Sequence, residues 1–257
     1  MFHLAKWYLD VVTDEGAVII AYAARLRWGR LRLDYASVLH APPGESTRET
    51  STFGTTGLPE LVGDRVTWRH RSLRFDGQWD RLAPPFEKCL LKVGDGDLIW
   101  TCVIPRSQAT VELDGRPHRG IGYVEHLSLT IPPWDLPFNT LEWGRHASNA
   151  HSVVWIAWRG RDTRSFIWRD EAEQPAATLE RNGVCLRAGE ALKLGASRDL
   201  CARPALTRVL DRLPRLSRRV AARVAAMFEH KMVAPSQLVI AGSPVDSGWS
   251  IFEDVAW

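Results

Sequence analysis

Residues 6–16 read KWYLDVVTDEG, a stretch in which large apolar and polar side chains alternate before a turn. Successive side chains of an extended strand point to opposite faces. The stretch therefore places Trp7, Leu9 and Val11 on one face, and Tyr8 and Asp10 on the other. Because residues 14–16 have the composition of a turn and residues 17–28 alternate again, we expect a β-hairpin here.

The same pattern recurs along the chain, with short alternating runs separated by turn signals such as Asp76-Gly77 and Asn182-Gly183. A renewed set of runs begins near Ala150. Short strands at this spacing are typical of an all-β barrel or sandwich and not of a βαβ fold. We therefore expect an all-β protein with two β domains, at residues 1–148 and 149–257.

One segment has helical periodicity instead. Between residues 213 and 230, apolar side chains recur at helical spacing on one stripe and arginines on another. We expect an amphipathic helix at 213–230 near the C-terminus. Its apolar stripe could close the end of a barrel, or the helix could make peripheral contact with an anionic membrane through its arginines.

Composition excludes several classes of function. The net charge of +3 is weak and spread along the chain, so no nucleic-acid partner is expected. No apolar run reaches the roughly 20 residues of a membrane helix, and no secretion signal is evident, so we expect a cytoplasmic protein. The eight His and four Cys lack the spacing of metal ligands, so no metal site is expected. The sequence does not determine the oligomeric state.

Two acidic residues are candidates for catalysis. Tyr8 and Asp10, like Tyr123 and Glu125, stand two residues apart, so each pair shares one face of a strand. That face is either solvent or the lumen of a barrel. A carboxyl group in an apolar lumen tends to keep its proton and can act as a general acid. The 12 Trp residues suit both a core and a cavity wall, and their rings stabilise cations.

Three motifs resemble those of the lipocalin-like carotenoid hydratase family, which includes hydroxyneurosporene synthase and related cyclases. Residues 6–16 are similar to its Trp-Tyr-x-Asp opening, residues 120–126 to its Gly-Tyr-x-(Asp/Glu)-His segment, and residues 143–145 to its Trp-Gly-Arg motif. The resemblance covers the first 150 residues well and the rest loosely. It implies a calycin, lipocalin-like fold with two β-barrel-type units and no cofactor, metal or nucleotide.

The resemblance also implies a set of site residues. The catalytic candidates are Asp10, Glu125, Tyr8 and Tyr123, and the ligand-binding candidates are Trp7, His126, Trp143 and Arg145. His126 falls on the strand face opposite Glu125, so both can line one lumen only where a bulge intervenes; the alternative is a structural hydrogen bond from His126 to a turn. An arginine beside a tryptophan in residues 143–145 could likewise be a signature of the fold.

Three functions remain open from the sequence. The first is a cofactor-independent enzyme that uses acid–base catalysis to hydrate, cyclise or isomerise an apolar polyene or isoprenoid-like molecule. The second is a lipocalin-like carrier of a hydrophobic small molecule. The third is a protein without a ligand, in which the Trp residues only pack a core. A carboxyl group deep in the site would distinguish an enzyme from a carrier, because a carrier needs no buried acid.

Overall fold

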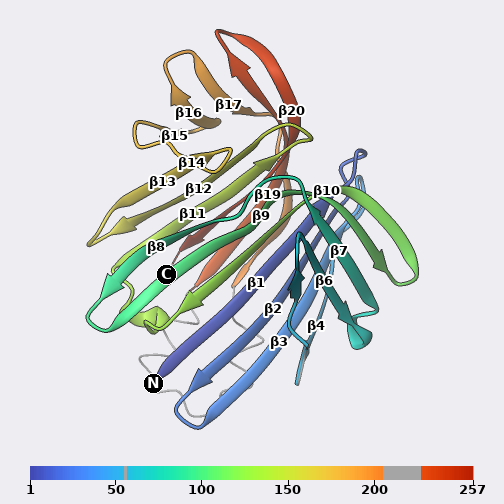
Figure 1. Ribbon diagram of the computed structural model, residues 1–257, viewed down its shortest axis with the longest axis vertical. Coiled ribbons are helices and arrows are strands. Elements are labelled where there is room, and N and C mark those ends of the chain that lie inside the picture. The colour runs from blue at the N-terminus through green and yellow to red at the C-terminus, as the bar shows by residue number, and fades with distance from the viewer. Residues whose placement is uncertain (55–56, 205–226, 257) are drawn as a thin grey trace. The chain divides into compact units, whose positions relative to one another are not determined.

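The computed structural model describes residues 1–54, 57–204 and 227–256, which form two antiparallel β-sheets (Figure 1). The chain divides into two compact units, Met1–Pro132 and Pro133–Trp257, with one sheet in each. The expectation of an all-β fold is confirmed, with two large antiparallel sheets. No helix of the described residues is both long and apolar enough to cross a membrane.

The first sheet begins with the predicted hairpin. β1 and β2 pair in register from Phe2–Trp28 to Val12–Val18. The order of its strands is β4-β3-β2-β1-β10-β9-β7-β6-β5, with β8 also pairing with β9, and the 3-10 turn η1 (Arg71–Leu73) joins β6 to β7. The strands are β1 (Phe2–Val12), β2 (Val18–Trp28), β3 (Leu31–Ala41), β4 (Arg48–Phe53), β5 (Glu60–Val62), β6 (Arg65–His70), β7 (Phe75–Arg81), β8 (Phe86–Val93), β9 (Gly96–Leu113) and β10 (Arg116–Leu129).

The second sheet has the order β14-β13-β12-β11-β20-β19-β17-β16-β15, with β18 also pairing with β19. A 3-10 turn, η2 (Pro133–Asp135), precedes it. Its strands are β11 (Phe138–Ala147), β12 (Ser152–Gly160), β13 (Arg164–Arg169), β14 (Ala172–Glu173), β15 (Thr178–Glu180), β16 (Gly183–Arg187), β17 (Glu190–Leu194), β18 (Arg198–Pro204), β19 (Phe228–Ile240) and β20 (Ser243–Ala256).

Two sequence predictions differ from the structure. The units divide at Pro132–Pro133, earlier than the expected boundary at 148/149, because β11 pairs with β12 and β20 of the second sheet. The expected helix at 213–230 falls mostly on residues 205–226, which lie outside the described residues. Its last three residues, Phe228–His230, are not helical, because they pair with β18 and β20 as the start of β19.

Each unit has its own apolar core on one face of its sheet. In the first unit, Leu9 and Val11 of β1 belong to this core with Trp68, Trp79 and the other members of a buried cluster. In the second unit, the core includes Val153, Trp155, Ile167 and Leu238. The alternation in β1 is therefore as the sequence predicts, and Tyr8 and Asp10 occupy the face of the first sheet opposite its core cluster.

Candidate active site

Strand register brings the two predicted acid–tyrosine pairs together. β1 pairs with β10 so that Tyr8 is opposite Glu125 and Asp10 is opposite Tyr123. Residues directly opposite in an antiparallel pair share one face of the sheet. The four side chains therefore form one cluster, which we call the carboxyl cluster, and Asp10 and Glu125 are diagonal neighbours within it.

The carboxyl cluster is buried. Asp10 is 0% exposed and Glu125 is 8% exposed, and both tyrosines are buried. A carboxyl group removed from water needs hydrogen-bond donors, because an unsatisfied buried polar group is costly. The Tyr123 hydroxyl donates to the Glu125 Oε2 atom at 2.8 Å, and the Trp100 indole Nε1 donates to the same atom at 2.6 Å.

Residue 122, the glycine of the Gly-Tyr-x-Glu segment, has no room for a side chain. A Cβ atom on Gly122 would lie 2.5 Å from the backbone oxygen of Asp10 and 2.7 Å from the Trp79 ring. That close approach lets the Trp79 indole donate to the Asp10 backbone oxygen at 2.7 Å. The core-facing tryptophan thus fixes the backbone of β1 at the position that carries the acid.

Bulges in β9 determine where Trp100, the indole donor, lies relative to Glu125. The register between β10 and β9 shifts on both sides of Val124. The extra residues lie in β9 and include Pro105, which lacks the N–H that a regular ladder requires. Beyond these bulges, Cys102 is opposite Glu125 and Trp100 is opposite Leu127, so both β9 side chains share the face of Glu125.

Tyr123 stays protonated in this setting. Burial, and then the neighbouring Cys102 and Glu125 side chains, raise the pKa of the Tyr123 hydroxyl well above its ordinary value of 10.0. The phenol is therefore a permanent donor to Glu125. The ring of Tyr8 packs edge-on against Tyr22 and Tyr123, with centroids 5.3 and 6.0 Å apart, so the cluster contains packed aromatic rings beside its acids.

Two of the predicted ligand-binding residues lie on the other face of the same strands. Trp7 is opposite His126 in the register, and their rings are 4.9 Å apart between centroids. Burial, and then the nearby His3, lower the pKa of His126, so this imidazole is neutral near pH 7. The structure pairs Trp7 with His126 and separates both from the carboxyl cluster, as strand alternation predicts for His126.

The other two predicted ligand-binding residues belong to the second unit. Trp143 and Arg145 are both buried on β11, where they are opposite Glu253 and Ile251 of β20. The Nη1 atom of Arg145 donates to the backbone oxygen of Trp249 at 2.7 Å. Arg145 therefore ties β11 to β20, and this contact supports the interpretation of residues 143–145 as a fold signature.

The sequence did not reveal every polar group on these faces. Trp100 was not singled out, because an indole one strand away from Glu125 has no local signal in the sequence. Lys231 was also missed. It is 1% exposed and forms ion pairs with Glu253 and, at 3.8 Å, with Glu229. Only the scarcity of lysine, five residues among 33 basic ones, could have drawn attention to Lys231.

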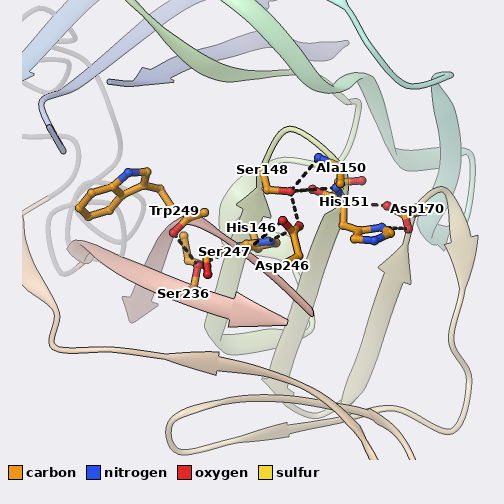
Figure 2. A network of polar contacts seen from close by, with 12 residues as sticks. His146, Ser148, Ala150, His151, Asp170, Ser236, Asp246, Ser247 and Trp249 are labelled. Atoms are coloured by element: carbon orange, nitrogen blue, oxygen red, sulfur yellow. Dashed lines mark hydrogen bonds and ion pairs between the residues drawn. The ribbon is translucent and has the colours of Figure 1, made fainter. Parts of the chain in front are cut away.

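A second polar network lies in the second unit and resembles a catalytic triad in composition (Figure 2). The Ser236 hydroxyl is 2.8 Å from His146 Nδ1, and His146 Nε2 is 4.0 Å from a carboxylate oxygen of Asp246. However, the 4.0 Å between His146 and Asp246 is longer than a hydrogen bond, and Ser236 also accepts a hydrogen bond from the Ser250 hydroxyl at 2.8 Å, so the ordered relay of a triad is not formed. Figure 2 shows this network joining β11, β19 and the start of β20, which is a structural arrangement.

In the part of the chain that the structure describes, no group of three or more His, Cys, Asp or Glu side chains is placed to hold a metal ion. The carboxyl cluster instead combines two buried acids, neutral hydrogen-bond donors and aromatic rings. Such a set can donate a proton, accept one and stabilise a cation between the two steps.

Comparison with known proteins supports the fold. No protein-family model and no curated protein matches the sequence. Among solved structures, CghA has a TM-score of 0.56 and 14% identity, covering 99% of this chain and 88% of CghA. A protein from Nitrosomonas europaea described as an AttH candidate has a TM-score of 0.56 and 10% identity, covering 98% and 92% of the two chains.

Kievitone hydratase from Nectria haematococca is also similar, with a TM-score of 0.54 and 12% identity over 98% of this chain and 88% of the hydratase. At these identities the likeness shows the fold alone. The fold is lipocalin-like, as the resemblance of the N-terminal motifs implies.

Proposed function

We propose that the chain is an acid–base enzyme that acts on carbon–carbon double bonds of an apolar polyene or isoprenoid-like molecule, without a cofactor. The observation that carries this proposal is the buried Glu125 carboxyl, which accepts hydrogen bonds from two neutral donors beside a second buried acid, Asp10. A carrier of an apolar ligand has no use for two buried carboxyl groups. Proteins retain such a cost mainly where the groups are used.

Glu125 is the proton donor in this proposal. The Tyr123 hydroxyl and the Trp100 indole both donate to its Oε2 atom and hold the carboxyl group in place. When the proton of the Glu125 carboxyl moves to an alkene carbon, the π electrons form the new C–H bond and a carbocation remains. Trp100 and Tyr123 then hydrogen-bond to the carboxylate that is left, which lowers the cost of the transfer. The aromatic rings of the cluster stabilise the cation.

Asp10 completes the proton balance. In a hydration, water attacks the cation and Asp10 accepts the proton that the water loses. In a cyclisation, a second double bond attacks the cation to form a ring and a new cation, and Asp10 accepts the proton that this new cation loses. In an isomerisation, Asp10 accepts the proton that a carbon next to the first cation loses. The name of one structural neighbour, kievitone hydratase, favours the first of these reactions.

Deuterium labelling tests the proposal. We expect molecules that copurify with the protein to be apolar, and a panel of polyenes and isoprenoids incubated with it in D2O to gain deuterium at carbon, read by mass spectrometry. Glu125→Gln should keep the fold and ligand binding but lower the rate of labelling by about 100-fold or more, because the amide cannot donate an acidic proton. Glu112→Gln, an exposed change on β9, is the matched control and should leave the rate unchanged.

The outcome also separates the alternative function. If ligands bind but are recovered without deuterium from both the parent protein and Glu125→Gln, the chain is a lipocalin-like carrier. If Glu125→Gln labels an identified substrate at the parent rate, the proposed role of Glu125 is wrong. Circular dichroism of each variant shows whether a loss of labelling comes from unfolding.

A further inference from the structure

A cavity of about 820 Å³ opens at one end of the first sheet, away from the carboxyl cluster. Its walls come from the β1–β2 hairpin, the β3–β4 loop, η1 and the β9–β10 hairpin. The lining includes three side chains of the first unit's core, Val38, Leu73 and Leu113, which form an apolar floor. The cavity is therefore apolar at its base, and its other lining residues are mostly polar or charged.

Strand register places the polar lining on the core face of the sheet. His40 is opposite both Ile19 and Arg48, His118 is opposite Val111, and Arg116 is opposite Leu113. Ile19, Val111 and Leu113 all belong to the core cluster, so their partners share its face. The carboxyl cluster lies on the opposite face, so the two sets of residues are distinct.

Two histidines meet in this cavity. The rings of His40 and His118 are 5.0 Å apart between centroids and nearly perpendicular. Burial, and then the neighbouring His118, lower the pKa of His40; burial, and then Arg116, lower that of His118. Both imidazoles are therefore neutral near pH 7. The Nε2 atom of His40 is buried and has no hydrogen-bond partner among the described residues, so a polar group of a ligand would satisfy it.

The charged groups of the cavity favour an anion. Three arginines line it, at positions 48, 74 and 116, against two carboxylates, Glu45 and Asp114. Arg74 is already paired with Asp114 at 3.2 Å. Within the described part of the chain, Arg48 and Arg116 have no ion-pair partner, and they stand on the same face as the two histidines. Their guanidinium groups present planar donors that match a carboxylate.

We propose that this cavity binds a small organic carboxylate, with its hydrocarbon body on Val38, Leu73 and Leu113 and its carboxylate on His40, Arg48 and Arg116. The inference does not depend on the proposed function, because the site is on the other face of the sheet and uses none of its residues. A bound carboxylate stabilises the protonated form of both imidazoles, so binding takes up protons and strengthens as the pH falls.

The test titrates hexanoate into the full chain and follows the ring C–H signals of His40 and His118 by NMR. Hexanol and hexylammonium, which have the same hydrocarbon body, are the matched probes. We expect hexanoate to bind at least tenfold more tightly than either, and about threefold or more tightly at pH 6 than at pH 8, because binding is linked to proton uptake.

Variants locate the site. Arg48→Gln and His40→Asn should each weaken hexanoate binding by about tenfold, the effect of losing one charge-assisted hydrogen bond. Arg32→Gln, an exposed arginine near the other end of β3, is the control and should bind like the parent protein. Equal binding of hexanoate and hexylammonium, an equal effect of Arg32→Gln, or no shift of either histidine signal would overturn the proposal. None of these results bears on labelling by Glu125.

Discussion

Strand for strand, the second sheet repeats the order of the first, so that β1 corresponds to β11, β9 to β19 and β10 to β20. The two sheets can be aligned at their first hairpins, which end with the pairs Val12–Val18 and Ala147–Ser152. This alignment matches Asp10 with Arg145, and Glu125 with Glu253. Both units therefore have a glutamate at this position, Glu125 or Glu253, but its neighbours differ between the units.

The partners of this carboxyl differ in charge. Glu125 receives hydrogen bonds from the neutral Tyr123 and Trp100, whereas Glu253 receives one from the ammonium group of Lys231. Lys231 stands where the first unit has Cys102. Burial alone would lower the pKa of Lys231, but the carboxylates of Glu253 and Glu229 outweigh burial and raise it well above the ordinary value. The ion pair therefore favours the charged form of Lys231.

The comparison teaches that one position in this fold can serve two purposes. A carboxylate held by a buried cation has a fixed charge and contributes to structure. A carboxyl that accepts hydrogen bonds from neutral donors can exchange its proton, which is the property that acid catalysis requires. Disrupting each set of partners should therefore produce effects of different kinds in the two units.

The largest effect is expected from Lys231→Met. Removing the ammonium group leaves the Glu253 carboxylate in a buried site without its cation, which should lower the free energy of unfolding by about 3–5 kcal/mol. Urea denaturation measures this loss. The exposed Lys193→Met on β17 is the matched control and should change stability little.

A double variant sharpens this result. Lys231→Met combined with Glu253→Gln removes both charges, so it should recover part of the lost stability. If Lys231→Met alone is as stable as the parent protein, the contrast between an ion-paired and a neutrally bound carboxyl fails.

The same contrast shows what the sequence could and could not predict. Alternation in residues 6–16 was enough to place Tyr8 and Asp10 on one face, and the Tyr-x-acid spacing placed Tyr123 beside Glu125, to which it donates. The pairing of β10 with β1 was not predicted. The donor Trp100 and the cation Lys231 come from neighbouring strands, and bulges in β9 set the position of Trp100. Register across strands depends on tertiary pairing, which local periodicity does not encode.

The predicted domain boundary differs from the structure for a related reason. Pro132, Pro133 and Pro137 interrupt the chain before residues 138–147, but the renewed strand pattern near Ala150 places the expected boundary later, so the sequence alone assigns residues 138–147 to the first unit. Pairing partners decide the matter, because β11 lies between β12 and β20 in the second sheet. A strand's membership in a sheet is a long-range property, whereas its existence is a local one.

An intermediate effect is expected in the second core. Leu9 and Ala21 are paired in the first unit, and the equivalent pair in the second is Gly144 and Trp155. The larger side chain of the pair is on β1 in the first unit and on β12 in the second. A Cβ atom on Gly144 would lie 2.1 Å from the Trp155 ring. Gly144→Ala should therefore destabilise the protein by about 1–3 kcal/mol through overpacking, measured by thermal or urea unfolding.

The control for Gly144→Ala is the same substitution in a variant with a smaller side chain at position 155. If the clash with Trp155 is the cause, Trp155→Leu should make room, and Gly144→Ala should cost less in that background than in the parent protein. Equal costs in the two backgrounds would show that the two positions do not compensate each other, and that the alignment of the cores is incorrect at this point.

The smallest effect concerns a histidine that replaces an apolar residue. His146 occupies the position of Val11, which is fully buried in the first core. Burial lowers the pKa of His146 below its ordinary value of 6.5, although Asp246 acts in the opposite direction, and Arg145 and His151 add to the lowering. His146 is therefore neutral in the folded chain, where its Nδ1 atom is 2.8 Å from the Ser236 hydroxyl (Figure 2).

The sign of the resulting pH dependence follows from linkage. The unfolded chain binds a proton at this imidazole more readily than the folded one, so the contribution of His146 is complete above about pH 6.5 and declines as the pH falls further. His146→Val, which copies the first unit, should reduce the slope of stability against pH between 6.5 and 5 by up to about 1.4 kcal/mol per pH unit. His3→Gln, which changes a partly buried histidine of the first unit, should leave the contribution of His146 in place. Urea unfolding at several pH values measures each slope, and an unchanged slope in His146→Val would mean that Asp246 offsets the burial of His146 and that this position does not distinguish the two units.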